Sequence, residues 1–304
     1  MLRAALERGA VAASRLRVVG LEAVASTVCA TLRDELDGET VQVQPRNVVL
    51  AVGAWLGTLG QELGIETPEL CPAKGTHVVL EQPRRPLTCG VLLRHPSDAR
   101  LLTLTPWHDA LLLGSTDVEC DPAELNCPKP TVEEVEYLLA ALAAAAPNWT
   151  PRVLAAWSGI RPLLGHSGDR TADLSREDRL LDAAPGVVAI AGGKLTTFRR
   201  LAQRTLDRVD ELSGHSGPAE PFPHLQPLPT GLHELARDGL VSTLDEVMTQ
   251  RLPLSLLHPD AAAGRAPGIA SEIAPIMRWS TEACEQQVAS YRAGLDRFRD
   301  PRRA

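Results

Sequence analysis

Short apolar runs alternate with polar segments along the first two thirds of the chain, and this pattern predicts strands interspersed with helices. The run "RLRVVGLEAV" predicts a strand. The segment "STVCATLRDELDGETVQVQ" predicts a hairpin that turns at Asp37-Gly38, because Asp-Gly favours the tight turns of hairpins. A buried strand at Asn47–Val52 is expected next, followed after Gly53 by a helix that runs to Leu63. In "KGTHVVLEQ" and "ARLLTLTPWHDALLLGSTD", apolar runs are separated by Pro, Gly and Asp, as in antiparallel strands.

The clearest helix is "TVEEVEYLLAALAAAAPNW". Thr131 and Glu134 have the spacing of a capping box, and Pro147 ends the run. A strand near Val153–Gly159 precedes the polar segment Arg161–Asp182. Helices and strands thus alternate around a β-rich insert, which predicts a fold of the α/β class.

The most informative segment is "APGVVAIAGGKLTTFRRLAQRTLDRVDEL", in which an apolar run meets a glycine pair, a lysine and an amphipathic helix that begins at Leu195. This is the layout of a strand, a phosphate-binding turn and a helix. A Walker A loop requires Ser or Thr after the lysine, and here Leu195 follows Lys194. A G-x-G-x-x-G pattern is absent from the whole chain, because no two of its glycines lie two residues apart. The turn is therefore neither an ATP-type nor a dinucleotide-type loop.

The physics of this turn still favours an anion or the electron-rich edge of a ring. Gly192 and Gly193 allow a ligand to approach the backbone, and the first amides of the next helix carry a partial positive charge. Lys194 adds a cation, and Thr196 and Thr197 can cap the helix or contact the ligand. The alternative is an ordinary turn in which a threonine caps the helix and the lysine faces water.

Length and composition limit the possible classes of protein. With 304 residues and 44% apolar residues, the chain has room for about two domains with a substantial core. The segment 214–230 is rich in Pro, Gly and Ser and predicts a linker, and the remainder to residue 304 predicts helices. The net charge of −7 argues against a general nucleic-acid binder. The six cysteines form no C-x-x-C pair, which argues against a zinc knuckle and a redox dithiol, and no metal is expected.

Nothing at the N-terminus has the pattern of a signal peptide, and no window approaches the roughly 18 consecutive apolar residues of a membrane-spanning helix. The expectation is a soluble cytoplasmic protein, or at most one that is peripheral to the inner face of the cytoplasmic membrane.

Basic residues are concentrated in one part of this acidic chain. Between Gly159 and Arg208 there are nine basic and six acidic residues, a local excess of +3. Arg161 follows a predicted strand, and Arg176 lies in a polar loop. Arginines at such places suit the bidentate capture of a phosphate or a carboxylate, although each one alone is more often a surface ion-pair partner. Together they predict a small anionic substrate.

Several segments resemble, in order, the motifs of FAD-dependent glycerol-3-phosphate dehydrogenases of the D-amino-acid-oxidase-like flavoprotein superfamily. These segments are "NVVLAVGAW", "CPAKGTHVVL", "LLTLTPWHDALLLGSTDVECDP", "TVEEVEYLLAAL", "WSGIRPLL", "SRED" and "VVAIAGGKLTTFRRLAQ". "LVSTLDEVMTQRLPLSLLH" resembles the start of the family's helical C-terminal domain. The resemblance covers nearly the whole chain.

The chain departs from the family pattern in one respect. In the family, a strand, glycine loop and helix that bind the ADP half of FAD precede all of these motifs, and this sequence begins after them. The resemblance therefore implies an incomplete FAD-binding domain with a mainly antiparallel β substrate domain, together spanning residues 1–213. The linker 214–230 and a small α-helical domain, 231–304, follow. Because the pyrophosphate-binding half of the site is not in this sequence, we expect little or no bound FAD.

The resemblance also implies roles for individual residues. Arg161 and Arg176 match the arginines that hold the substrate phosphate, assisted by Lys194. His77 matches a histidine on the substrate side, and it is the candidate general base; the alternative is an ordinary strand histidine. The residues that match the flavin-binding positions are Gly53, Gly192, Gly193, Lys194, Leu195 and Thr196.

The implied reaction is oxidation of sn-glycerol 3-phosphate to dihydroxyacetone phosphate, with electrons passing through FAD to a quinone at the membrane surface. Two alternatives remain open. The chain is a truncated, non-catalytic remnant of that enzyme, or it is a related FAD-dependent oxidase that acts on an amino acid or a hydroxy acid. The pair Arg161 and Arg176 and the helical C-terminal domain favour the phosphate substrate over the second alternative.

Overall fold

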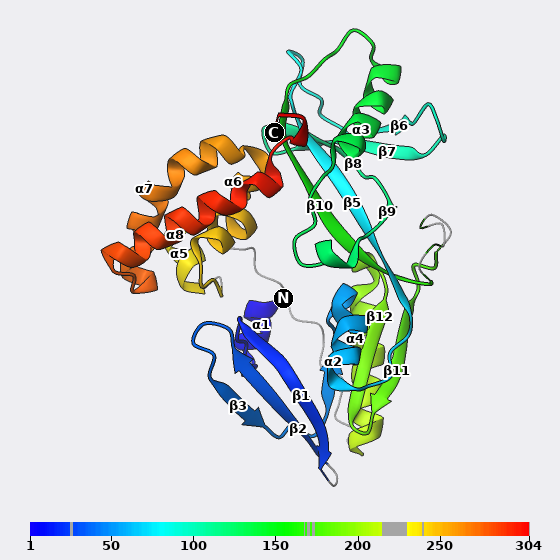
Figure 1. Ribbon diagram of the computed structural model, residues 1–304, viewed down its shortest axis with the longest axis vertical. Helices are drawn as coiled ribbons and strands as arrows, with labels where there is room; N and C mark the ends of the chain where they lie inside the picture. The colour runs from blue at the N-terminus through cyan, green and yellow to red at the C-terminus, as the bar shows by residue number, and fades with distance from the viewer. Residues whose placement is uncertain are drawn as a thin grey trace.

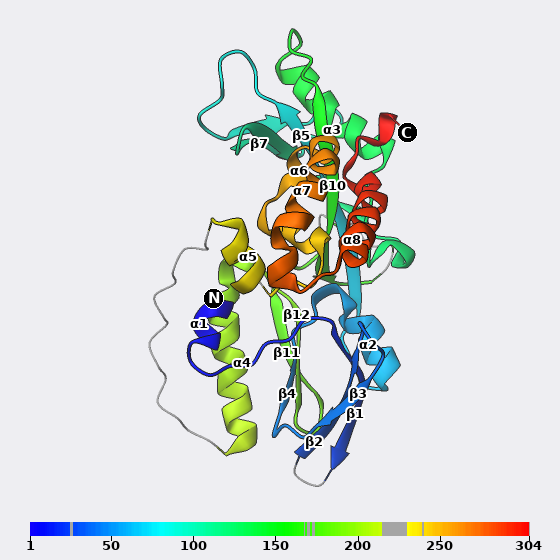
Figure 2. The same cartoon turned by 90° about the vertical axis from the view of Figure 1, so that its left-hand side faces the viewer.

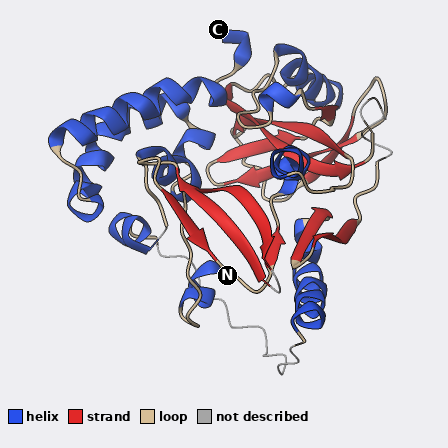
Figure 3. Ribbon diagram, turned by 60° about the horizontal axis from the view of Figure 1, so that its bottom comes forward, coloured by secondary structure: helices blue, strands red, loops and turns tan. Residues whose placement is uncertain are grey.

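The computed structural model describes the chain except residues 25–26, 167, 169–170, 172–173, 215–229, 239 and 304 (Figure 1). The described part contains three β-sheets and a C-terminal group of helices. In Figure 3 the strands form the middle of the molecule and the long C-terminal helices lie to one side. The predicted α/β class is confirmed.

The first sheet follows a short helix, α1 (Leu2–Leu6), and has the antiparallel order β1-β2-β3. Its strands are β1 (Leu16–Val24), β2 (Thr27–Asp34) and β3 (Thr40–Val43). The predicted turn at Asp37-Gly38 is confirmed: Gly38 has φ +81°, and the Asp37 carboxylate accepts a hydrogen bond from the Glu39 amide at 2.9 Å.

The second sheet is antiparallel throughout and has the order β10-β5-β8-β7-β6, with β9 paired to β5. Its strands are β5 (Leu70–Glu81), β6 (Val91–Arg94), β7 (Leu101–Trp107), β8 (Ala110–Gly114), β9 (Val118–Glu119) and β10 (Val153–Leu164). A 3-10 turn, η2 (Pro122–Glu124), follows β9. The antiparallel arrangement expected for the middle of the chain is confirmed.

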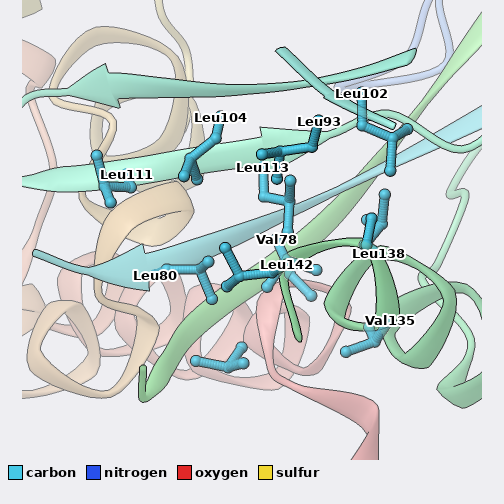
Figure 4. Close-up of a cluster of buried hydrophobic side chains, with 13 residues drawn as sticks. Val78, Leu80, Leu93, Leu102, Leu104, Leu111, Leu113, Val135, Leu138 and Leu142 are labelled. Carbon is cyan, nitrogen blue, oxygen red and sulfur yellow. The ribbon is translucent and has the colours of Figure 1, made fainter. Parts of the chain in front are cut away.

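Helix α3 (Val132–Ala145) covers one face of this sheet. The predicted capping box is present, since the Thr131 hydroxyl accepts from the Glu134 amide and Glu134 accepts from the Thr131 amide. Figure 4 shows the core between them, where Leu138 and Leu142 of α3 meet Val78, Leu80 and other leucines of the sheet. Burial of this apolar surface attaches the helix to the sheet.

The third sheet has the order β11-β12-β4 and contains the one parallel pair of the described strands, β12 with β4. Its strands are β4 (Val48–Leu50), β11 (Asp178–Ala184) and β12 (Val187–Gly192). The helices that follow its parallel strands are η1 (Gly53–Trp55) with α2 (Leu56–Leu63), and η3 (Leu195–Thr197) with α4 (Phe198–Ser213). The helix predicted to follow Gly53 and to run to Leu63 is therefore confirmed.

Two sequence predictions about strands were wrong in part. The strand predicted as buried over Asn47–Val52 has three residues, and Val49 within it is 40% exposed. The polar segment Arg161–Asp182 begins and ends with strand residues, because β10 continues to Leu164 and β11 starts at Asp178. Strand β10 is this long because it pairs with β5 as far as Leu164 opposite Leu70, a long-range partner that the local sequence does not reveal.

The C-terminal helices share a core of their own, which includes Met248, Ile273, Tyr291 and Leu295. Figure 2 shows these helices beside β10 of the second sheet. Leu257 packs there in one buried cluster with Ala155. The elements are α5 (Leu232–Asp238), the π-helix η4 (Glu246–Arg251), α6 (Leu254–Leu257), α7 (Pro259–Met277), α8 (Thr281–Gly294), η5 (Leu295–Phe298) and η6 (Pro301–Arg303).

The helices predicted for this region are thus confirmed. Most of the predicted linker lies outside the described residues, which do not include 215–229. Among the described helices, none is long and apolar enough to cross a membrane.

Candidate active site on one face of a β-sheet

Glycines leave room on the face of the β5–β10 pair that lies opposite α3. His77 pairs with Trp157, Gly75 pairs with Gly159, and Arg161 lies two residues further along β10 on the same face. We call this the glycine face; its residues are Gly75, His77, Gly114, Trp157, Gly159 and Arg161. A Cβ on Gly75 would lie 2.3 Å from the Arg161 guanidinium, and one on Gly114 would lie 2.2 Å from the His77 ring. Both large side chains therefore depend on a neighbouring glycine.

The Arg161 guanidinium is held by the segment between β8 and β9. Nη2 donates to the Ser115 hydroxyl at 2.5 Å, and Nη1 donates to the Thr116 carbonyl and the Asp117 carboxylate, both at 3.3 Å. Burial lowers the pKa of Arg161, and the Asp117 carboxylate opposes this shift. Arginine nevertheless stays protonated in proteins, so the group is a fixed cation.

Asp117 connects three arginines that are far apart in the sequence. Its side chain is only 3% exposed, and its carboxylate lies 2.7 Å from Arg100, 3.2 Å from Arg176 and 3.3 Å from Arg161. We call these four residues the arginine cluster. The cluster contains three cations and one carboxylate, so two positive charges are not balanced within it. An anion is the ligand that such an excess favours.

Sequence reasoning named Arg161 and Arg176 but missed Arg100, Ser115 and Asp117. A signal was present, because "GSTD" places three polar residues directly after the apolar run of β8. Arg100 gave no comparable signal, since it precedes β7 and reaches Asp117 only through the folding of the sheet.

His77 is enclosed by aromatic and glycine neighbours. Its ring stacks on Trp157 with centroids 4.7 Å apart and an angle of 24°. His77 Nδ1 and Trp157 Nε1 are buried and have no hydrogen-bond partner in the described part of the chain. Burial, and secondarily the charge of Arg161, lower the pKa of His77 to about 4. The imidazole is therefore neutral at pH 7 and has an unprotonated nitrogen to accept a proton.

The predicted cofactor-binding glycines meet at the carboxyl edge of the parallel β4–β12 pair. Ala189 of β12 lies opposite Leu50 of β4. Gly192 and Gly53 each follow three residues later, so both lie where the chain leaves the same edge of the sheet. Gly53, Gly192 and Gly193 all have positive φ, at +60°, +70° and +92°. A Cβ on Gly192 would lie 2.4 Å from the Glu177 carbonyl, whereas one on Gly53 would meet no atom within 4 Å. Ligands of parallel sheets bind at this kind of edge.

The three residues after the glycine pair face outward. Lys194, Leu195 and Thr196 are exposed, and Leu195 is 83% exposed. The Thr197 hydroxyl donates to the Lys194 carbonyl at 3.0 Å, so it does not cap the amides of the turn. Neither Lys194 nor these amides are occupied by a side-chain partner in the described residues, which leaves donors for a ligand.

The predicted site residues thus lie in two groups that β10 connects. Arg161 and His77 belong to the glycine face, and Arg176 joins Arg161 through Asp117. Gly53 and the turn at Gly192 form the second group, and η1 contacts both β10 and β12. A Cβ built on Gly192 would lie 3.4 Å from the Leu164 side chain. Leu164 is three residues from Arg161 along β10, a distance of roughly 10 Å in a strand.

The basic excess predicted for Gly159–Arg208 is not one continuous patch. Arg204 pairs with Asp178, and Arg208 pairs with Asp182 at 2.5 Å and with Glu211 at 2.7 Å. The pairs with Asp178 and Asp182 attach α4 to β11, and the pair with Glu211 lies within α4. Arg204 and Arg208 are therefore paired with nearby carboxylates, in contrast to the excess of cations in the arginine cluster.

The sequence matches the family of FAD dependent oxidoreductases over residues 1–199, and the chain belongs to that family. Over 206 residues it is 31% identical to the mitochondrial glycerol-3-phosphate dehydrogenase of Arabidopsis thaliana. The aligned region covers 66% of this chain and 32% of the plant protein. The chain is 31% identical over 178 residues to the aerobic glycerol-3-phosphate dehydrogenase of Staphylococcus epidermidis, covering 57% of this chain and 32% of the relative. The chain spans about a third of the length of these relatives.

The fold is also that of a solved structure. The glycerol-3-phosphate dehydrogenase of Bacillus halodurans, determined with FAD, superposes with a TM-score of 0.79 over 98% of this chain and 71% of that one, at 22% identity. The predicted family resemblance and fold class are confirmed. FAD is the cofactor of this family, and the open space at Gly53 and the exposed donors after Gly193 fit such a group.

Proposed function

We propose that this chain contributes to the oxidation of sn-glycerol 3-phosphate to dihydroxyacetone phosphate. The observation that carries the proposal is the presence of Arg161 and His77 on one face of the β5–β10 pair, with an excess of guanidinium charge beside them. A phosphate ester of a small alcohol requires a cationic site for its phosphate and a proton acceptor for its hydroxyl. The family and its dehydrogenase relatives support the same substrate class.

In this proposal Arg161 and Arg176 bind the substrate phosphate. Guanidinium groups match phosphate oxygens in pairs, and the partly buried position of Arg161 strengthens each charge-assisted hydrogen bond. Lys194, exposed at the start of η3, supplies a further mobile cation. Fixing the phosphate fixes the position of the carbinol carbon, so positioning is the main contribution of these residues.

His77 accepts the proton of the C2 hydroxyl in this proposal. A pKa of about 4 keeps the ring neutral and ready to accept, but it also makes the ring a weak base while the site is empty of substrate. Burial is the main cause of this low pKa, and an anionic phosphate beside Arg161 would offset only the smaller contribution of the Arg161 charge.

Gly53 and the five residues Gly192, Gly193, Lys194, Leu195 and Thr196 would hold FAD. When bound, this cofactor accepts the hydride equivalent from the substrate. The outward amides at the start of η3 stabilise negative charge near them, because the N-terminal end of a helix carries partial positive charge.

The finer assignments extend the same proposal. Residues 1–213 form the cofactor and substrate core, 214–230 the linker and 231–304 a helical domain; the separate core of α5–α8 supports this division. A quinone is the final electron acceptor, and contact with it takes place at the surface of a membrane.

The test compares ligand binding by the wild-type chain, Arg161→Ala and Arg208→Ala, using isothermal titration calorimetry with glycerol 3-phosphate, glycerol and glycine. Losing one bidentate arginine should weaken glycerol 3-phosphate binding about 10- to 100-fold. Arg208→Ala removes two surface ion pairs, with Asp182 and with Glu211; it is the matched control and should bind as the wild type does. Equal binding by Arg161→Ala would contradict the phosphate site. Preference for glycine over glycerol 3-phosphate would favour an amino-acid oxidase instead.

A further inference from the structure

The backbone around Asp117 is attached to neighbouring parts of the fold by hydrogen bonds. The Thr116 amide donates to the Thr76 carbonyl at 3.2 Å, and the Thr116 hydroxyl donates to the buried Glu134 carboxylate at 2.9 Å. On the other side, the Thr171 hydroxyl donates to the Asp117 carbonyl at 3.0 Å. The backbone that carries Asp117 is therefore attached to β5, to α3 and to residue 171.

The three arginines reach Asp117 from separate elements. Arg100 comes from the turn before β7, Arg161 from β10 and Arg176 from the segment before β11. Their side chains are partly exposed, with Arg176 the most open at 48%. Three like charges repel one another, and long side chains lose conformational freedom when they converge. Something fixed and negative is needed to keep them together.

We propose that Asp117 is a positioning residue that keeps Arg100, Arg161 and Arg176 convergent as one anion-binding group, and that Arg100 is the third arginine of the phosphate site. This inference rests on the proposed function and deepens it, because it assigns residues that the resemblance to known dehydrogenases did not supply. Asp117 acts through the arginines and does not itself contact the anion.

Two effects of removing the carboxylate have opposite signs. Considered only as a change in charge, Asp117→Asn makes the cluster more positive and should tighten the binding of any anion. If the carboxylate positions the guanidiniums, the same change lets them separate and weakens binding. The Asn side chain has nearly the same size as Asp and cannot balance the guanidinium charges. The direction of the change therefore decides between the two roles.

The experiment measures the dissociation constants of glycerol 3-phosphate and inorganic phosphate by calorimetry for the wild-type chain, Asp117→Asn and Asp182→Asn. We expect about tenfold weaker binding of both ligands to Asp117→Asn, since charge-assisted hydrogen bonds are lost. Asp182→Asn removes a partly exposed carboxylate that pairs with Arg208, and it should bind within about twofold of the wild type. Unchanged or tighter binding by Asp117→Asn overturns the positioning role.

The pH dependence of ligand binding is a second measurement, and it would not change in Asp117→Asn if Asp117 had a purely structural role. The second ionisation of a phosphate monoester lies near pH 6, so wild-type binding should weaken as the pH falls below about 6. Separated arginines discriminate less between mono- and dianion, and Asp117→Asn should show a flatter profile. If binding to Asp117→Asn depends on pH as steeply as binding to the wild type, Asp117 does not keep the three arginines convergent.

Arg100→Gln keeps the inference testable if Asp117→Asn does not fold. Loss of the third guanidinium should weaken phosphate binding about five- to tenfold; wild-type affinity in Arg100→Gln would remove Arg100 from the site and overturn the inference. If the wild type binds inorganic phosphate but not glycerol 3-phosphate, the proposed substrate is wrong, and the effect of Asp117→Asn on phosphate alone decides the inference. If the wild type binds neither ligand, both proposals are wrong.

Discussion

The two faces of the β5–β10 pair are built from the same strands, but they differ in whether their polar groups have partners within the fold. Along β5, every second side chain lies on the α3 face. Lys74 and Thr76 are the polar residues of this row, and Val78 and Leu80 are its apolar residues. Buried Glu134 of α3 accepts hydrogen bonds from Thr76 and Thr116 and lies 3.2 Å from the Lys74 ammonium. Every charge there has a partner inside the fold.

The glycine face leaves polar groups unbalanced. His77 Nδ1 and Trp157 Nε1 are buried without a partner in the described residues, and the arginine cluster has two cations in excess. Buried polar groups are normally satisfied, so a concentration of exceptions on one face indicates a place for a ligand. The α3 face therefore pairs its polar groups within the fold, whereas the glycine face holds polar groups that have no partner among the described residues.

The largest expected effect is on the α3 face. Lys74→Met removes the cation that pairs with Glu134 and Glu124, and it leaves the Glu134 carboxylate buried. A buried charge without its partner should lower the free energy of unfolding by about 3–5 kcal/mol. Urea titration of the wild type and the variant measures the loss. The double variant Lys74→Met with Glu134→Leu removes both charges and should recover part of it; a single variant as stable as the wild type would contradict the comparison.

The second prediction concerns His77 on the glycine face. Its folded pKa is about 4, against 6.5 unfolded, so between these values the unfolded chain binds more protons. The stabilisation is complete above pH 6.5 and is lost as the pH falls toward 4, and 2.5 units correspond to at most about 3 kcal/mol.

Urea titrations at pH 7 and pH 5 should show this slope in the wild type and a smaller one in His77→Gln. Trp157→Ala, which opens the ring to water, should also reduce the slope, because burial is the main cause of the lowered pKa. An unchanged slope in His77→Gln would show that another group causes the pH dependence.

The smallest effect is expected at the capping box of α3. Thr131→Ala removes the hydroxyl that accepts from the Glu134 amide at 3.2 Å and should cost about 1 kcal/mol. Ser280→Ala, which removes the corresponding cap of α8, should cost about the same.

The two variants separate stability from binding. Glu134 also holds Thr116 beside Asp117, so Thr131→Ala should weaken phosphate binding slightly, whereas Ser280→Ala should leave it unchanged. Calorimetry with inorganic phosphate measures both. If the two variants affect phosphate binding equally, the N-terminal cap of α3 does not influence the arginine cluster.

Local features of the fold could be read from the sequence. The hairpin turn at Asp37-Gly38, the capping box of Thr131 and Glu134, and the strand before Gly192 depend on neighbouring residues, and all are confirmed. The length of β10 could not be read, because strand propensity near Arg161 and Pro162 is poor and pairing with β5 overrides it.

The candidate site divides in the same way. By itself the sequence determined that a glycine turn precedes a helix that begins at Leu195, that Arg161 and Arg176 are available, and that the motifs belong to one oxidoreductase family. Only the tertiary structure brought Arg100 to Asp117, stacked Trp157 on His77 and aligned Gly53 with Gly192. The physical reason is that local patterns specify turns, caps and alternating faces. Which charges meet is decided by strand register between residues that lie tens of positions apart.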